Sequence, residues 1–86
     1  MEGRIVCSKA GRDKGSFLVV VREEGGFLYV ADGKERPLEN PKRKNKKHLA
    51  LTNTYLEKNS CLTNKSLKRE LAVYRDRAAK EDAENV

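Results

Sequence analysis

The sequence predicts a mainly β domain: a small barrel followed by one α-helix. Short β-branched and aromatic runs, separated by turn residues, fill the first two-thirds of the chain, and the apolar period becomes helical in the last third. With 86 residues, of which 37% are hydrophobic, the chain can build one modest core. Short strands joined by tight turns hide their edges and their core by curling, so we expect a barrel rather than a flat sheet.

Four segments have the pattern of strands: Arg4–Ser8, Phe17–Val21, Phe27–Ala31 and Lys47–Asn53. The second is a continuous apolar run, which is typical of a strand covered on both faces. Gly25-Gly26 and Asp32-Gly33 are turn dipeptides that follow strands. Residues 34–46 contain Pro37 and Pro41 and are otherwise polar except for Leu38, so they predict a loop with one short edge strand near Leu38. The strand aromatics Phe27 and Tyr29 are assigned first to the core, because few aromatic residues are available to fill it.

The final third has helical spacing. Its apolar stripe comprises Leu67, Leu71, Tyr74 and Ala78, with Tyr74 turned to the barrel. Thr63 or Asn64 can cap the helix, since a short side-chain oxygen there accepts an unpaired backbone N–H. The chain after Arg77 is mostly polar and is expected to fray. The expected organisation is therefore a barrel over 1–54, a loop and packed helix over 55–77, and a polar tail over 78–86.

Charge narrows the class of partner. Nineteen Lys and Arg residues stand against thirteen Asp and Glu, for a net charge of +6, and the surplus lies before residue 76. A basic body suits a polyanionic partner. Cys7 and Cys61 have no CxxC partner and predict free thiols in a reducing cytosol. The N-terminal residues lack a secretory pattern and no run has transmembrane length, so a cytoplasmic protein that does not bind membranes is expected.

Two basic segments lie at predicted turns. In the first, Gly11 and Gly15 allow a sharp bend on which Lys9, Arg12 and Lys14 stand. The second, Lys42–His48, places five cations in six residues, which a folded protein tolerates at a solvated or anion-facing position. Lys34 and Arg36 would extend the same patch if the Asp32-Gly33 turn lies on that side. The alternative is that basic segments of this kind serve only to keep the protein soluble.

Residues suited to catalysis are sparse. His48 is the only histidine, and the cations beside it would depress its protonation, which makes it a poor general base. No His, Cys and carboxylate cluster has the spacing of metal ligands, and the glycine turns do not match a phosphate-binding loop. We therefore expect a protein without catalytic residues, metal or cofactor.

The segment Gly3–Val21, centred on Ser8–Gly15, resembles the KOW motif, a strand–turn–strand unit of SH3-like barrels in ribosomal proteins and transcription elongation factors. The chain is similar to small bacterial KOW-domain proteins related to an archaeal and eukaryotic large-subunit ribosomal protein, and the likeness extends to Tyr74. The resemblance implies a five-stranded SH3-like barrel that binds rRNA, with Gly11 as the motif glycine. Some KOW modules bind proteins instead of RNA.

The resulting expectation is a cytoplasmic, ribosome-associated RNA-binding protein, monomeric when free, whose partners are large-subunit rRNA and ribosomal proteins. The expected RNA contacts are Lys9, Arg12, Lys14, Lys34, Arg36, Lys42, Arg43, Lys44, Lys46, Lys47 and His48, largely to phosphates and riboses. Two alternatives remain open. One is a protein-interaction adaptor that uses the barrel edges and the helix face around Leu67, and the other is a DNA-associated transcription-elongation module.

Overall fold

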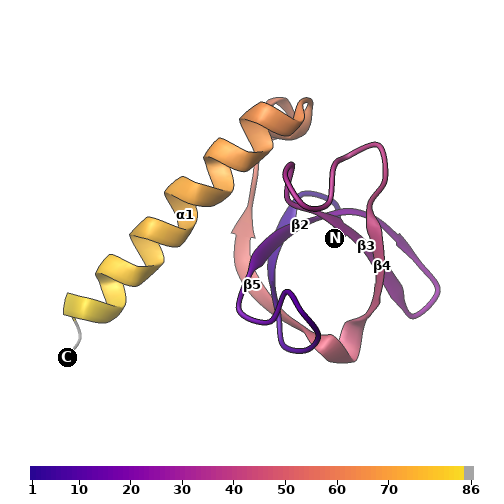
Figure 1. Cartoon of the computed structure of the whole chain (residues 1–86), viewed down its shortest axis with the longest axis horizontal. Helices are drawn as coiled ribbons and strands as arrows, with labels where there is room; N and C mark the ends of the chain where they lie inside the picture. Colours follow the sequence, from indigo (N-terminus) through magenta and orange to yellow (C-terminus); the bar gives the residue numbers. More distant parts are fainter. Residues whose placement is uncertain (85–86) are drawn as a thin grey trace.

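Five antiparallel strands form one sheet in the order β4-β3-β2-β1-β5 (Figure 1). The strands are β1 (Arg4–Ser8), β2 (Phe17–Glu24), β3 (Phe27–Ala31), β4 (Lys42–Asn45) and β5 (Leu49–Tyr55), and the helical segments are η1 (Lys46–His48), η2 (Lys58–Cys61) and α1 (Asn64–Glu84). The computed structural model describes residues 1–84, with side chains through residue 79. The expected fold class is confirmed: a mainly β domain with one C-terminal helix.

The sheet curls into a small barrel that is open at one seam. Figure 1 looks into the ring of strands, with the edge strands β4 and β5 joined by the single turn of η1. Among the described residues the hydrogen-bonded ladder does not continue from β4 to β5. Register shifts between Val20 and Arg22 in β2, and between Arg4 and Val6 in β1, bend these strands, as bulges do. The arrangement resembles an SH3-like barrel without full closure.

The core has two parts, one on each face of the sheet. The barrel interior contains Val6, Leu18, Val20, Leu28, Val30 and Leu49. On the outer face, Ile5, Val19 and Ala31 are covered by Leu67 and Leu71 of α1. Consecutive residues Leu18, Val19 and Val20 are all buried because they alternate between these two clusters. The continuous apolar run of β2 is thus explained by a strand covered on both sides.

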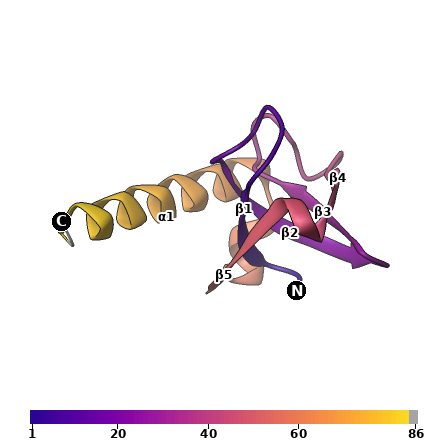
Figure 2. The same cartoon turned by 90° about the horizontal axis from the view of Figure 1, so that it is seen from below.

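Helix α1 starts where expected and packs through its first turns. Thr63 caps it, because the Ser66 backbone N–H donates to Thr63 Oγ1 at 3.1 Å. Tyr74 faces the barrel, with its ring edge-to-face against Phe17 at 5.1 Å between centroids. Beyond Tyr74 the helix projects away from the barrel (Figures 1 and 2). No helix among the described residues is long and apolar enough to cross a membrane.

Several boundaries differ from the sequence-based expectation. Residues 78–84 continue α1 instead of fraying, because alanine and long charged side chains are good helix formers and no glycine or proline interrupts them. Residues 85 and 86 lie outside the described part of the chain. The last strand starts at Leu49 rather than Lys47, since the Lys47 N–H bonds to the Asn45 side chain and turns the chain into η1.

The edge strand is also displaced. It was expected near Leu38 but lies at Lys42–Asn45, inside the basic segment. The Leu38 N–H donates instead to Asn64 Oδ1 at 2.7 Å, which ties the β3–β4 loop to the start of α1. Gly33 tucks under the same helical turn: its φ is +82°, and a Cβ there would lie 2.4 Å from the Asn64 carbonyl oxygen. The β3–β4 loop is therefore fixed in place by the helix.

Candidate nucleic-acid interface

The β1–β2 loop, residues 9–16, is a compact turn that points its cations outward. Gly11 (φ 85°) and Gly15 (φ 88°) both take the left-handed backbone conformation expected of them. The Gly15 N–H donates to the Ser8 carbonyl at 2.8 Å, and the Ser16 N–H donates to the Asp13 carbonyl at 2.9 Å. The side chains of Lys9, Arg12 and Lys14 are exposed on this turn. Much of the hydrogen-bonding capacity of the turn's backbone is used within the turn. The three cationic side chains are therefore not needed to satisfy it and remain available to an anion.

Lys44 holds this loop from underneath. Its residue is only 8% exposed, and its Nζ donates to Asp13 Oδ1 at 2.7 Å, to the Ala10 carbonyl at 3.1 Å and to Ser8 Oγ. An ammonium group has three N–H donors, so this set uses all of them. Lys44, expected at the RNA, therefore has no donor left for a phosphate. It fixes the shape of the loop that carries the exposed cations.

Asp13 is the acidic partner in this anchor. Partial burial alone would raise its pKa, but hydrogen bonds from Lys44 and Ser8, with the charges of Lys44 and Lys42, hold the pKa below its ordinary value. The carboxylate is thus ionised at neutral pH and neutralises the buried ammonium. Neither group of the pair adds net charge to the surface.

The two predicted basic segments lie side by side. The Lys9 N–H donates to the His48 carbonyl at 2.8 Å, which joins the start of the β1–β2 loop to the end of η1. Lys47 and His48 are exposed at this junction. Lys46 is close by but forms an ion pair with Glu23 of β2, so its charge is partly compensated. Lys9 and His48 are almost forty residues apart in the sequence. Their segments are brought together by this backbone hydrogen bond and by the contacts of Lys44 with the β1–β2 loop.

A hollow lies between the β1–β2 loop, the β3–β4 loop and the start of β4. Arg12, Arg36 and Lys42 line this hollow of about 550 Å³ together with the acidic residues Asp13, Asp32 and Glu35. Asp32 is engaged within its own turn, because its Oδ1 accepts from the N–H groups of Lys34 (2.8 Å) and Arg36 (2.9 Å). Three cations from three different segments thus converge on one concave surface.

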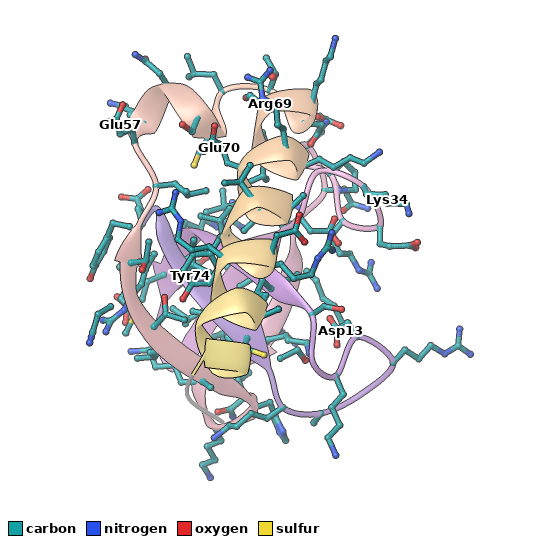
Figure 3. All side chains as sticks on the ribbon, turned by 90° about the vertical axis from the view of Figure 1, so that its left-hand side faces the viewer. Asp13, Lys34, Glu57, Arg69, Glu70 and Tyr74 are labelled. Carbon is teal, nitrogen blue, oxygen red and sulfur yellow. The ribbon has the colours of Figure 1, made fainter. Side chains whose placement is uncertain are left out.

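A second hollow continues the first along α1. It has a volume of about 360 Å³ and shares Ser16, Asp32 and Glu35 with its neighbour. Its cations are Lys34, Lys68 and Arg75. In Figure 3, Lys34 lies on the loop beside the first half of the helix, on the side away from Tyr74. Lys68 and Arg75 were not expected at this surface, although a spacing of seven residues places both on one helix face.

The cations on these segments, all exposed except the half-buried Arg36 and Lys42, form a surface that we call the basic loop surface: Lys9, Arg12, Lys14, Lys34, Arg36, Lys42, Lys47, Lys68 and Arg75. Arg43 does not belong to it. That side chain lies on the outer face of the sheet, with its guanidinium carbon 4.8 Å from the centre of the Phe27 ring. Phe27 and Tyr29 also lie outside both core clusters, so their assignment to the core was wrong.

The chemistry available at this surface is anion binding. Three cationic side chains line each of the two hollows beside carboxylates, and charge-assisted hydrogen bonds to phosphate are the interactions that these cations favour. Among the residues whose side chains are described, no three His, Cys, Asp or Glu side chains gather in a metal-binding group. Burial, reinforced by the charge of Glu70, raises the pKa of the Cys61 thiol, so that thiol is a weak nucleophile at neutral pH.

Comparisons with known proteins do not assign this chain to a family. The chain matches no family model and has no significant match among curated protein sequences.

Proposed function

We propose that this protein is a non-catalytic RNA-binding protein that docks on folded ribosomal RNA through the basic loop surface. The single observation that carries the proposal is the convergence of Arg12 of the β1–β2 loop, Arg36 of the β3–β4 loop and Lys42 of β4 on one hollow, which adjoins a second hollow lined by further cations. Cations at such positions can follow a phosphate backbone that turns in three dimensions, as in folded RNA. The resemblance of Gly3–Val21 to the KOW motif supports the ribosomal assignment.

The mechanism is electrostatic and shape-based. Each phosphate that a lysine or arginine neutralises releases condensed counterions, so affinity accumulates with the number of contacts and falls steeply with salt. Phosphate and ribose contacts fix orientation without reading bases, and double-stranded RNA is recognised mainly in this way. The Lys44 anchor supplies preorganisation, because the loop does not have to be ordered when the RNA binds.

The protein-adaptor alternative loses one of its two expected surfaces. The helix face around Leu67, Leu71 and Tyr74 packs on the barrel and is not available to a partner. A protein partner would therefore have to use the sheet edges.

The test is a binding series over salt concentration with a folded fragment of large-subunit rRNA and a duplex DNA of equal charge. We expect tighter binding to the folded RNA and a steep loss of affinity with salt. The double variant Arg12→Glu/Lys42→Glu should bind the RNA at least tenfold more weakly and reduce the log–log salt slope by about 2, close to 0.9 for each lost contact.

The matched control is Lys58→Glu/Arg69→Glu, which makes the same charge change at positions that line neither basic hollow. It should lose much less affinity. Equal losses of affinity in the two double variants would mean that binding depends only on net charge. A salt slope near zero in the wild type would favour a protein partner.

A further inference from the structure

A second surface lies on the outer face of β2, β3 and β4 and carries aromatic rings under arginine side chains. On β3, Leu28 and Val30 point into the barrel, so the alternate residues Phe27 and Tyr29 point outward. The register places Tyr29 between Arg22 of β2 and Arg43 of β4. We call these four residues, Arg22, Phe27, Tyr29 and Arg43, the aromatic face.

Each ring is in contact with a guanidinium group. The Arg22 guanidinium carbon lies 4.0 Å from the centre of the Tyr29 ring, and that of Arg43 lies 4.8 Å from the centre of the Phe27 ring. Such contacts hold the arginine planes against the rings and leave N–H groups at their edges free for an anion. Arg22 also pairs with Glu24 at 3.6 Å, whereas Arg43 takes part in none of the ion pairs found among the described side chains.

Packing does not explain this face. Phe27 is 38% exposed, and neither ring belongs to a core cluster. Helix α1 covers β3 only at its last residue, Ala31, and lies on the other side of the barrel from the rest of β3 and from β4 (Figure 1). Aromatic residues are scarce in this chain, with three Tyr, two Phe and no Trp, yet two of the five, the exposed Phe27 and the half-buried Tyr29, point outward here. A ligand can therefore reach Phe27 and the outer part of Tyr29.

The aromatic face adjoins the basic loop surface across one strand. Along β4, Lys42 lines the first basic hollow, and the next residue, Arg43, lies over Phe27 on the opposite side of the strand. β4 is an edge strand bonded only to β3. A polynucleotide that leaves the hollow at Lys42 therefore needs to cross only this free edge to reach the rings.

We propose that the aromatic face stacks unpaired nucleobases of a single-stranded RNA segment that flanks the folded element bound at the basic loop surface. The inference rests on the proposed function and adds the class of RNA: a structured element with an unpaired extension. Every base has a π-face that can stack on Phe27, Tyr29 or an arginine plane, while Arg43 contacts the neighbouring phosphate.

The composition of the face favours RNA over a protein partner. Its outward residues are aromatic or polar, and none is aliphatic. An aliphatic hollow exists elsewhere, lined by Leu38, Leu56 and Leu62, and has the character of a protein contact. The aromatic face instead combines stacking surfaces with positive charge, as single-strand binding surfaces do.

The test uses the full chain and two probes, an RNA hairpin and the same hairpin with a short single-stranded extension that carries 2-aminopurine. We expect the extension to tighten binding on the order of tenfold and the aminopurine fluorescence to be quenched in the complex. The variant Phe27→Leu/Tyr29→Leu should abolish both effects while hairpin affinity and the melting temperature stay close to those of the wild type. Phe27→Tyr should retain both.

The outcomes separate the two proposals. If the extension brings no gain, or if quenching is equal in the wild type and the double Leu variant while the hairpin still binds, the stacking surface is overturned and the loop interface stands; the face would then be assigned to a protein partner. If the hairpin does not bind and Arg12→Glu/Lys42→Glu changes nothing, the proposed function itself fails, and the stacking surface with it.

Discussion

The outer surface of the curled sheet has two parts that differ in cover and in composition. Where α1 crosses it, the sheet presents Ile5, Val19 and Ala31, and all three are buried. Across β3 and β4 it presents Phe27 and Tyr29 beside arginines, and Phe27 stays exposed. Both parts contain residues that hydrophobicity scales rank as apolar. Only the part under α1, whose residues are aliphatic, contributes to the core. Apolar residues of the outer face therefore divide into those buried under α1, which hold the fold, and those without that cover, which we propose face a partner.

The largest expected effect contrasts these two parts directly. Leu67→Ala removes a fully buried side chain from the helix–sheet cluster and should reduce the free energy of unfolding by about 2–5 kcal/mol. Phe27→Leu on the open part should cost less than about 1 kcal/mol. Urea unfolding followed by circular dichroism measures both. Similar losses would mean that the exposed rings are structural.

A second contrast concerns two glycines, one under the helix and one near the base of the β1–β2 loop. Gly33→Ala would place a Cβ 2.4 Å from the Asn64 carbonyl oxygen, whereas Gly15→Ala meets no atom within 4 Å; both have positive φ. We expect a loss of about 1–2 kcal/mol for Gly15→Ala from backbone strain alone and a clearly larger loss for Gly33→Ala. Thermal melts of the two variants measure these losses. An equal loss would show that the β3–β4 loop can move away from α1.

The third contrast lies within the basic segment. Lys44→Met leaves the partly buried carboxylate of Asp13 without its ammonium partner and should cost about 1–3 kcal/mol of stability. Lys47→Met changes an exposed side chain and should stay within about 0.5 kcal/mol. Lys47→Met should instead weaken RNA binding. A Lys44 variant as stable as the Lys47 variant would contradict the anchor.

The smallest effect is the pH dependence of the same anchor. Because the pKa of Asp13 is lower in the folded chain than its ordinary value of 3.8, its ionised form stabilises the fold above that pH, and this contribution is lost as the pH falls through the lowered value. We expect the difference in stability between wild type and Asp13→Asn to be constant at neutral pH and to shrink below about pH 4. Melts across the acid range measure it. A stability difference between wild type and Asp13→Asn that stays constant through the acid range would show that Asp13 does not contribute to the loss of stability in acid.

Local patterns predicted much of this structure. The alternating and continuous apolar runs located the first three strands, the stripe Leu67, Leu71 and Tyr74 located the packed helix face, and the glycines of the β1–β2 turn took the expected conformation. Each of these features depends on neighbours within a few residues. The helical end of the chain was missed because polarity was given more weight than helix propensity.

The two proposed binding surfaces depend on long-range pairing, which one sequence does not reveal. Lys42, Lys44 and Lys47 look alike in the segment, and only the β3–β4 register, with Leu28 opposite Lys44, sends that lysine beneath the loop. Likewise, whether Phe27 is core or surface depends on which side of the barrel α1 covers. The alternation of β3 showed that its two faces differ, but not which cover each face receives.

Ultraviolet crosslinking in cells, with the attached RNA sequenced and the crosslinked peptides identified by mass spectrometry, tests RNA binding at the basic loop surface. We expect large-subunit rRNA attached to peptides from residues 9–16 and 42–48. Recovery of no rRNA, or of rRNA attached only to peptides outside the basic loop surface and the aromatic face, would contradict this expectation.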